Sequence, residues 1–303
     1  MSHYYSLNEY CRNEFGKKLY KLSLDSAMTC PNRDGTIGTG GCIFCSDDGS
    51  GEFSAKPCGD INRQIEEAKK RVEHKNKGGG YIAYFQSFTN TYAPVDYLEK
   101  IFTEAVNHSD IDVLSVATRP DCLGDDVVEL LKKLNAVKPV WIELGFQTSN
   151  EKSASFIRRG YKNDVFTDAV KRLTTAGIKV VAHIIAGLPG ETYDDIESSV
   201  KFVCDSGIWG IKIHLLHVLK GTDLEKIYSQ GAFRCLEQEE YLDNICSLIE
   251  IIPEHIVIHR LTGDGDKKKL VAPLWSADKK RVLNTLAKKL DEKNIVQGKN
   301  IYK

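Results

Sequence analysis

Short runs of alternating apolar and polar residues predict strands along this chain, and each run is followed by a stretch with helical spacing. Strands that alternate with helices of about 10 to 15 residues are typical of βαβ units, which form parallel sheets. We expect strands at residues 20–25, 81–88, 111–118, 140–148, 178–187 and 208–219, a seventh at 255–261, and helices near 60–77, 94–108, 124–136 and 193–206. The series favours a full or partial barrel, and an open doubly wound sheet is the alternative.

The predicted strands are not apolar throughout, as strands buried on both faces of a parallel sheet normally are. Glu143 and Gln147 lie on one face of the fourth strand, Ser115 and Arg119 on one face of the third, and His183 on the fifth. We expect the apolar faces to contact the helices and these polar side chains to line a wet or ligand-filled interior. For each of them, a hydrogen-bonded place in the core is the alternative.

Composition and charge change this picture little. The 303 residues include 41 basic and 42 acidic side chains, and 42% of the chain is hydrophobic, which is enough for a large core. No apolar run reaches the roughly 18 residues that a membrane helix needs, and the first 25 residues lack the apolar core of a signal peptide. We therefore expect a cytoplasmic protein without a membrane partner, in which disulfides are rare.

Three of the nine cysteines share one glycine-rich loop after the first predicted strand. Cys42 and Cys45 form a C-x-x-C pair, and Cys30 precedes them in the same loop. A zinc ribbon requires a second close pair or a nearby histidine, and the sequence has neither at a suitable spacing. Three thiolates match three corners of a [4Fe–4S] cube, whose fourth iron then stays open for a ligand.

The loop CPNRDGTIGTGGCIFC resembles the cluster loop of the radical S-adenosylmethionine (radical SAM) superfamily, in the branch that includes the elongator catalytic subunit. The segments AHIIAGLPGET, ELGFQTSNEKSASFIRRGY and HRLTGDG extend the resemblance over nearly the whole chain, to the family of YtqA/MnmL and YhcC. The resemblance implies an α/β fold with a partial (β/α)6 TIM-like barrel. It also implies one [4Fe–4S] cluster on the three cysteines, and S-adenosylmethionine bound to the open iron and cleaved to a 5′-deoxyadenosyl radical.

Further residues outside the cysteines are expected at the site, from their places on the predicted strands and turns. The residues expected to bind S-adenosylmethionine are Phe44, Gln86, Ser87, Ser115, Glu143, Gln147, Arg159, Gly187 and Leu188. His183 and Arg119 are expected to be catalytic. The sequence departs from the superfamily at the end of the second strand, where FQSFTN stands in place of a Gly-Gly-Glu segment. Gln86 and Ser87 are expected to replace that carboxylate.

The C-terminal 37 residues carry most of the excess positive charge. Residues 267–303 contain eleven Lys and Arg and three acidic residues, a net charge of +8, and the rest of the chain carries −9. We expect a core at 1–265 and a basic extension at 266–303 with an amphipathic helix packed on the core. The side chains expected to face solvent and contact nucleic acid are Lys267, Lys268, Lys269, Lys280, Lys288 and Lys289.

The implied function is modification of tRNA at the C5 side chain of wobble uridine, specifically conversion of the carboxymethylaminomethyl group to aminomethyl. Implied partners are tRNA, a reductant such as flavodoxin or ferredoxin, and a downstream methyltransferase. The chain ends soon after HRLTGDG, so the acetyltransferase domain of the elongator branch, and with it acetyl-CoA chemistry, is not expected. Two alternatives stay open: a radical SAM enzyme for a small metabolite or peptide, and a non-enzymatic zinc or Fe–S protein.

Overall fold

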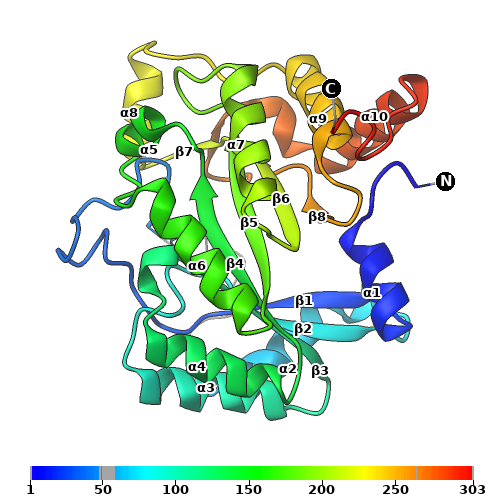
Figure 1. Cartoon of the computed structure of the whole chain (residues 1–303). Helices are drawn as coiled ribbons and strands as arrows, with labels where there is room; N and C mark the ends of the chain where they lie inside the picture. Colours follow the sequence, from blue (N-terminus) through cyan, green and yellow to red (C-terminus); the bar gives the residue numbers. More distant parts are fainter. Residues whose placement is uncertain (1, 48, 50–58, 264, 302–303) are drawn as a thin grey trace.

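Seven parallel strands form one curled sheet in the computed structural model of the protein, which describes residues 2–47, 49, 59–263 and 265–301 (Figure 1). The strands are β1 (Leu19–Leu24), β2 (Gly80–Phe85), β3 (Ile111–Thr118), β4 (Val140–Gln147), β5 (Lys179–Ala186), β6 (Gly210–Leu215) and β8 (Val257–Arg260). Each pairs in parallel with the next in this order. A doubly wound sheet reverses its strand order, so that alternative is excluded.

The barrel is partial, as the family resemblance implied. β1 and β8 stand at the two ends of the strand order and do not pair with each other. The residues just before α1 (Leu7–Phe15) lie along β8 instead, with a parallel bridge between Ser6 and Ile258. The predicted strand at 208–219 is too long: β6 ends at Leu215, and a separate β7 (Val218–Leu219) pairs antiparallel with β9 (Leu270–Ala272).

Helices cover the outer face of the sheet, as the alternating pattern predicted. They are α2 (Ile61–Val72), α3 (Val95–Asn107), α4 (Asp125–Asn135), α6 (Asn163–Thr175), α7 (Tyr193–Asp205) and α9 (Gln238–Ile251). Three further helices lie outside this layer: α5 (Glu151–Phe156), α8 (Asp223–Ser229) and α10 (Lys279–Glu292). Ile142, Leu144 and Phe146 on the outer face of β4 are fully buried in the main core against the helices of the layer. No helix in the described part of the chain is both long and apolar enough to cross a membrane.

Aromatic side chains close the amino-terminal end of the barrel interior. Tyr10 of α1 packs edge-on against Trp209 and Trp141, with ring centroids 4.7 and 6.0 Å away. His259 of β8 contacts both tryptophans. This group of rings, the aromatic plug, fills that end of the interior, and the carboxyl ends of the strands and the open side between β1 and β8 stay as routes for a ligand.

The C-terminal residues pack against α9 and against the start of the chain. α10 lies beside α9, and both ends of the chain lie on the same side of the molecule (Figure 1). Lys289 is only 8% exposed, and its ammonium group lies 2.6 Å from Asp243 and also contacts Glu239, both on α9. The prediction that Lys289 faces solvent is therefore wrong, because α9 supplies acids that hold it.

The other predicted nucleic-acid residues lie nearer the surface. Lys267, Lys268, Lys280 and Lys288 are exposed, and Lys269 is half-buried. Lys288 lies 3.4 Å from Glu292 on the same helix, a contact between exposed groups that holds neither side chain firmly.

The segment between β2 and α3 depends on one buried amide. Asn90 is fully buried and donates hydrogen bonds to the carbonyl oxygens of Phe85 and Ala117, at 3.2 and 2.8 Å. It also accepts a 2.6 Å hydrogen bond from the hydroxyl of Ser26. Asn90 thus joins the ends of β2 and β3 to the segment that leads into the cysteine loop.

Replacing Asn90 with Ala should lower the free energy of unfolding by about 2–4 kcal/mol, since buried carbonyl and hydroxyl groups lose their partner. Chemical denaturation monitored by circular dichroism measures this change. Asn107→Ala, at an exposed position at the end of α3, is the matched control and should change little. Equal losses for both variants would contradict the role of Asn90.

Candidate active site

The three loop cysteines line one cavity at the carboxyl ends of the parallel strands, where α/β barrels bind their ligands. Cys30, Cys42 and Cys45 share it with side chains from six strands and the segments that follow them. The predicted site residues that line it are Phe44, Gln86, Arg119, Glu143, Gln147, Arg159 and His183. The sequence therefore predicted a group of residues that the fold brings to one place.

Local contacts fix the path of the cysteine loop. The Asn32 amide donates to the carbonyl oxygen of Arg158 at 2.5 Å and lies 3.6 Å from the sulfur of Cys42. Gly49 has φ +55° and packs so closely on Phe88 that a Cβ there would lie 2.3 Å from the ring. A side chain at this position would force Phe88 to move, so glycine lets the backbone pass close to the segment that follows β2.

The electrostatic environment favours a thiolate at Cys42. A hydrogen bond from Cys45 is the main cause that lowers the pKa of the Cys42 thiol to about 7, and Arg119, Asn32 and Arg33 lower it further, while burial opposes the shift. Three thiols on one loop, with two guanidinium groups nearby to offset negative charge, fit a cluster that takes three cysteine ligands. Cys30, Cys42 and Cys45 would hold it.

The two buried arginines at the rim make well-defined contacts. Arg119 forms a two-pronged ion pair with Asp121, at 2.9 and 2.7 Å. Arg159 is 1% exposed and donates to the carbonyl oxygens of Phe146 and Thr148, at 3.2 and 2.7 Å. Its contacts hold the end of β4, so a role for Arg159 in binding a cosubstrate stays a prediction.

Glu143 lies at the centre of the polar interior and is fully buried. One carboxylate oxygen accepts from Lys21 at 2.7 Å and from Ser115 at 2.9 Å. The other accepts from His183 at 2.9 Å and from Lys212. These four donors occupy all the lone-pair positions of the carboxylate, so Glu143 is a counterion within the barrel rather than a free acceptor for a ligand.

The pKa values of this cluster follow from burial and from its charges. Burial raises the pKa of Glu143, but Lys21 and Lys212 outweigh it and hold the pKa well below the usual value. Burial, and then Lys212, lower the pKa of His183 to about 4, although Glu143 opposes the shift. His183 is therefore neutral near pH 7 and donates to Glu143, which favours a hydrogen-bonding role over that of a proton donor.

Four predicted residues lie outside the lining of this cavity. Ser87 is 1% exposed and Ser115 is fully buried beneath Glu143. Leu188 is 2% exposed in an apolar cluster with Ile43, and Phe44 packs against that cluster. Gly187 has φ +89°, and a Cβ there would contact Leu236. Their predicted contacts with a cosubstrate stay predictions.

An arm of the cavity with a mixed polar and apolar lining was not predicted from the sequence. It continues from Phe44 past Ile185, Leu215 and Leu216 to His217, at the ends of β5 and β6. Its apolar side chains suit a nucleobase, and Gln86 and Gln147 lie at the border between the arm and the cysteines. Leu215 ends β6 and Leu216 follows it, but their apolar character did not distinguish them from core residues.

Backbone strain is concentrated around the site. Ala27, Phe88, Gln147 and Arg158 have φ values of 56°, 58°, 68° and 58°, and they are four of the five non-glycine residues with positive φ in the described ranges. Gln147 also lies beside a register shift between β4 and β5, and its side chain lines the cavity. Strained residues of this kind persist mainly where function requires a particular geometry.

Sequence reasoning missed Lys21, Tyr84, Lys212 and Arg260. Lys21 and Lys212 occupy positions of their strands whose side chains point to the interior, where apolar residues are otherwise expected. The sequence therefore did carry a signal for both lysines. Arg260 carried no such signal. A register shift between β6 and β8 brings it to the interior face, where it lines the cavity.

Comparison with known proteins agrees with this geometry. The chain is 44% identical over 296 residues to the uncharacterized protein YtqA of Bacillus subtilis, covering 98% of this chain and 92% of that protein. It is 27% identical over 191 residues to a Methanocaldococcus jannaschii protein named tRNA uridine(34) acetyltransferase, covering 62% of this chain and 34% of that one.

Solved structures agree on the fold. An N-terminally truncated archaeal Elp3 of Methanocaldococcus infernus superposes with a TM-score of 0.69 at 17% identity, over 92% of this chain and 64% of that one.

The family model described as Radical_SAM C-terminal domain matches residues 208–292. The model described as Radical SAM superfamily matches residues 33–203, more than half of the chain. The chain therefore belongs to the radical SAM superfamily.

Proposed function

We propose that this protein is a radical SAM enzyme that modifies the C5 side chain of wobble uridine in tRNA. The observation that carries the enzymatic part is the set of three loop thiols that opens onto a polar cavity at the ends of the parallel strands. Membership of the superfamily implies S-adenosylmethionine and a [4Fe–4S] cluster, and the donor set fits them.

The residues around the cavity have separable tasks in this proposal. When bound, the cluster supplies the electron that cleaves S-adenosylmethionine to a radical able to abstract hydrogen from the substrate. Asn32, Arg33 and Arg119 lower the pKa of Cys42 and offset negative charge. Phe44 and the aliphatic side chains of the arm give a surface for the adenine, while Gln86 and Gln147 offer polar contacts beside it. The aromatic plug keeps water from reaching the interior from the amino-terminal ends of the strands.

Support for tRNA as the substrate comes from a relative and from surface charge. The related M. jannaschii protein bears the name of an enzyme that acts on uridine 34 of tRNA. In this chain, Lys267, Lys268, Lys280 and Lys288 are exposed and suited to phosphate contacts. We propose conversion of a carboxymethylaminomethyl group to aminomethyl. Abstraction of a hydrogen from the CH2 beside the carboxylate and loss of one further electron would give an imine, and its hydrolysis breaks the C–N bond and releases the two carbons as glyoxylate. Flavodoxin or ferredoxin would be the reductant for the cluster, and a methyltransferase would act on the aminomethyl product.

Replacing Cys30, Cys42 or Cys45 with Ala should each abolish 5′-deoxyadenosine formation, because each removes one cluster ligand. Anaerobic reconstitution with dithionite and S-adenosylmethionine, followed by chromatography of the products, measures this. Cys204→Ala is the control and should retain activity, since burial raises the pKa of that thiol to about 12 and it packs against the core. Full activity in any loop variant would refute the assignment.

Deleting the gene should make tRNA lose one modified wobble nucleoside and accumulate its precursor, the carboxymethylaminomethyl form. Mass spectrometry of nucleosides from total tRNA measures both species, and a plasmid that carries the wild-type gene should restore the product. A plasmid that carries the Cys42→Ala variant should not. An unchanged nucleoside profile in the deletion strain would remove tRNA as the substrate.

A further inference from the structure

The barrel interior holds two lysines against one carboxylate. Lys21 of β1 and Lys212 of β6 both donate to Glu143, and Lys212 is 4% exposed. The nearest titratable side chains do not supply a second negative charge to this cluster. Burial, and then Glu143, raise the pKa of Tyr84 well above its usual value, and His183 is neutral near pH 7. With both lysines protonated, this cluster of described residues carries one positive charge in excess.

Such an excess is costly in the folded protein. Burial and the neighbouring cations Lys21 and Arg260 lower the pKa of Lys212 well below its usual value, although Glu143 opposes the shift. A buried ion pair is commonly no more stable than apolar residues of the same volume, and an unpaired buried charge is worse. Stability alone therefore does not account for the second lysine, whereas a bound anion would compensate its charge.

The part of the cavity next to the lysine pair is lined by Tyr84, His214 and Arg260, and we call it the cavity floor. It presents hydrogen-bond donors. The carboxylate of Glu143 is already saturated by its four donors. The hydroxyl oxygen of Tyr84 accepts a hydrogen bond from the ammonium group of Lys212 at 3.3 Å, and Tyr84 lines the cavity. His214 Nε2 is buried and has no hydrogen-bond partner among the described residues. Arg260 lines the same floor.

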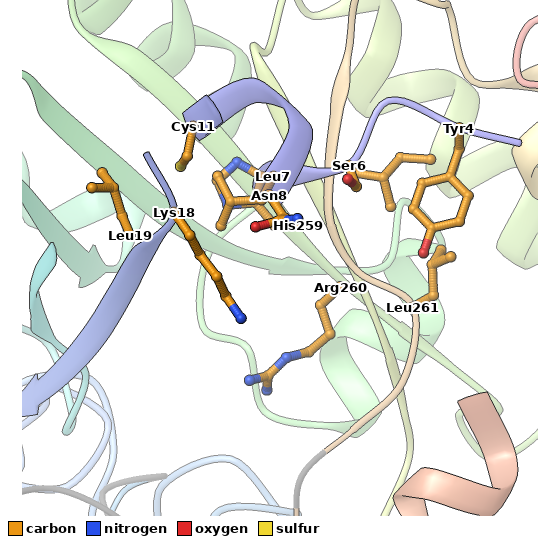
Figure 2. Close-up of a pocket in the computed structure, with 11 residues that line it drawn as sticks. Tyr4, Ser6, Leu7, Asn8, Cys11, Lys18, Leu19, His259, Arg260 and Leu261 are labelled. Atoms are coloured by element: carbon orange, nitrogen blue, oxygen red, sulfur yellow. The ribbon is translucent and has the colours of Figure 1, made fainter. Parts of the chain in front are cut away.

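A second pocket brings positive charge to this floor from the open side of the barrel. It lies between α1, the start of β1 and β8, and Arg260 lines both pockets. Figure 2 shows Arg260 and Lys18 directed into the same space from two sides. The described lining of this pocket includes Lys18 and Arg260 and no carboxylate, so its charge favours an anion.

We propose that the floor formed by Tyr84, His214 and Arg260, above the Lys21–Lys212 pair, binds an anionic group of the substrate. This deepens the proposed function and rests on it, because the side chain proposed for the substrate ends in a carboxylate. A backbone phosphate of RNA has the same charge chemistry, so the experiment includes both sources.

The charge excess predicts opposite effects of two substitutions on the ligand-free protein. Lys212→Met should keep or raise the melting temperature, because Glu143 retains Lys21, Ser115 and His183. Glu143→Gln should lower it by roughly 5–10 °C, because two ammonium groups lose their counterion. Anaerobic thermal denaturation measures both. Similar losses in the two variants would show that the pair carries no excess charge.

Ligand binding tests the anion site itself. The anaerobic holoprotein with S-adenosylmethionine should bind 5-carboxymethylaminomethyluridine roughly tenfold more tightly than the corresponding carboxamide, which has the same shape and no negative charge. Lys212→Met should bring the two affinities within about twofold of each other. Lys179→Met is the matched control, because Lys179 packs against Tyr10 and Trp209 at the amino-terminal end of the interior. This variant should keep the preference for the carboxylate over the carboxamide. Equilibrium dialysis measures these affinities.

The outcomes separate this inference from the proposed function. Uridine 3′-monophosphate is the third ligand, and preferential binding of it alone would identify the anion as a phosphate. Equal affinities for the carboxylate and the carboxamide, or no measurable binding of any of the three, would overturn the anion site even if tRNA from the deletion strain lacks a modification. A carboxylate preference with unchanged tRNA would instead leave the site in place and remove the tRNA substrate.

Discussion

One buried carboxylate organises the interior of this protein. Glu143 of β4 accepts hydrogen bonds from β1, β3, β5 and β6, so it joins strands that are far apart in the order of the sheet. A closed barrel would hold these strands by pairing its first strand with its last, and here β1 and β8 do not pair. The charge network gives the open barrel a connection across its interior that backbone hydrogen bonds do not supply.

The interior is layered, and the layers explain how the fold serves chemistry. Aromatic rings around Trp141 close the amino-terminal end, and the charged network of Glu143 lies above them. The cysteine loop lies at the carboxyl ends of the strands, where Gln86 and Gln147 face it. Radical chemistry requires a site from which water is excluded on one side and to which substrate has access on the other, and this order of layers provides both.

The cysteine loop, the polar strand faces and the strand order were accessible from the sequence. The loop stands out by residue type and spacing, and the period of two along a strand places Glu143 and His183 inside without further information. Other features depend on tertiary contacts. Arg260 reaches the interior through a register shift, and Lys289 is buried because α9 offers it two acids. Neither a bulge nor a partner helix leaves a local pattern in the chain.

The central claim is that three thiols hold an iron–sulfur cube whose fourth iron binds S-adenosylmethionine. Mössbauer spectroscopy of anaerobic, iron-57-labelled protein tests it most directly. The account predicts four irons per chain, of which one changes its isomer shift when S-adenosylmethionine is added. Protein that holds zinc in place of iron, or a cluster in which no iron responds to S-adenosylmethionine, would contradict it.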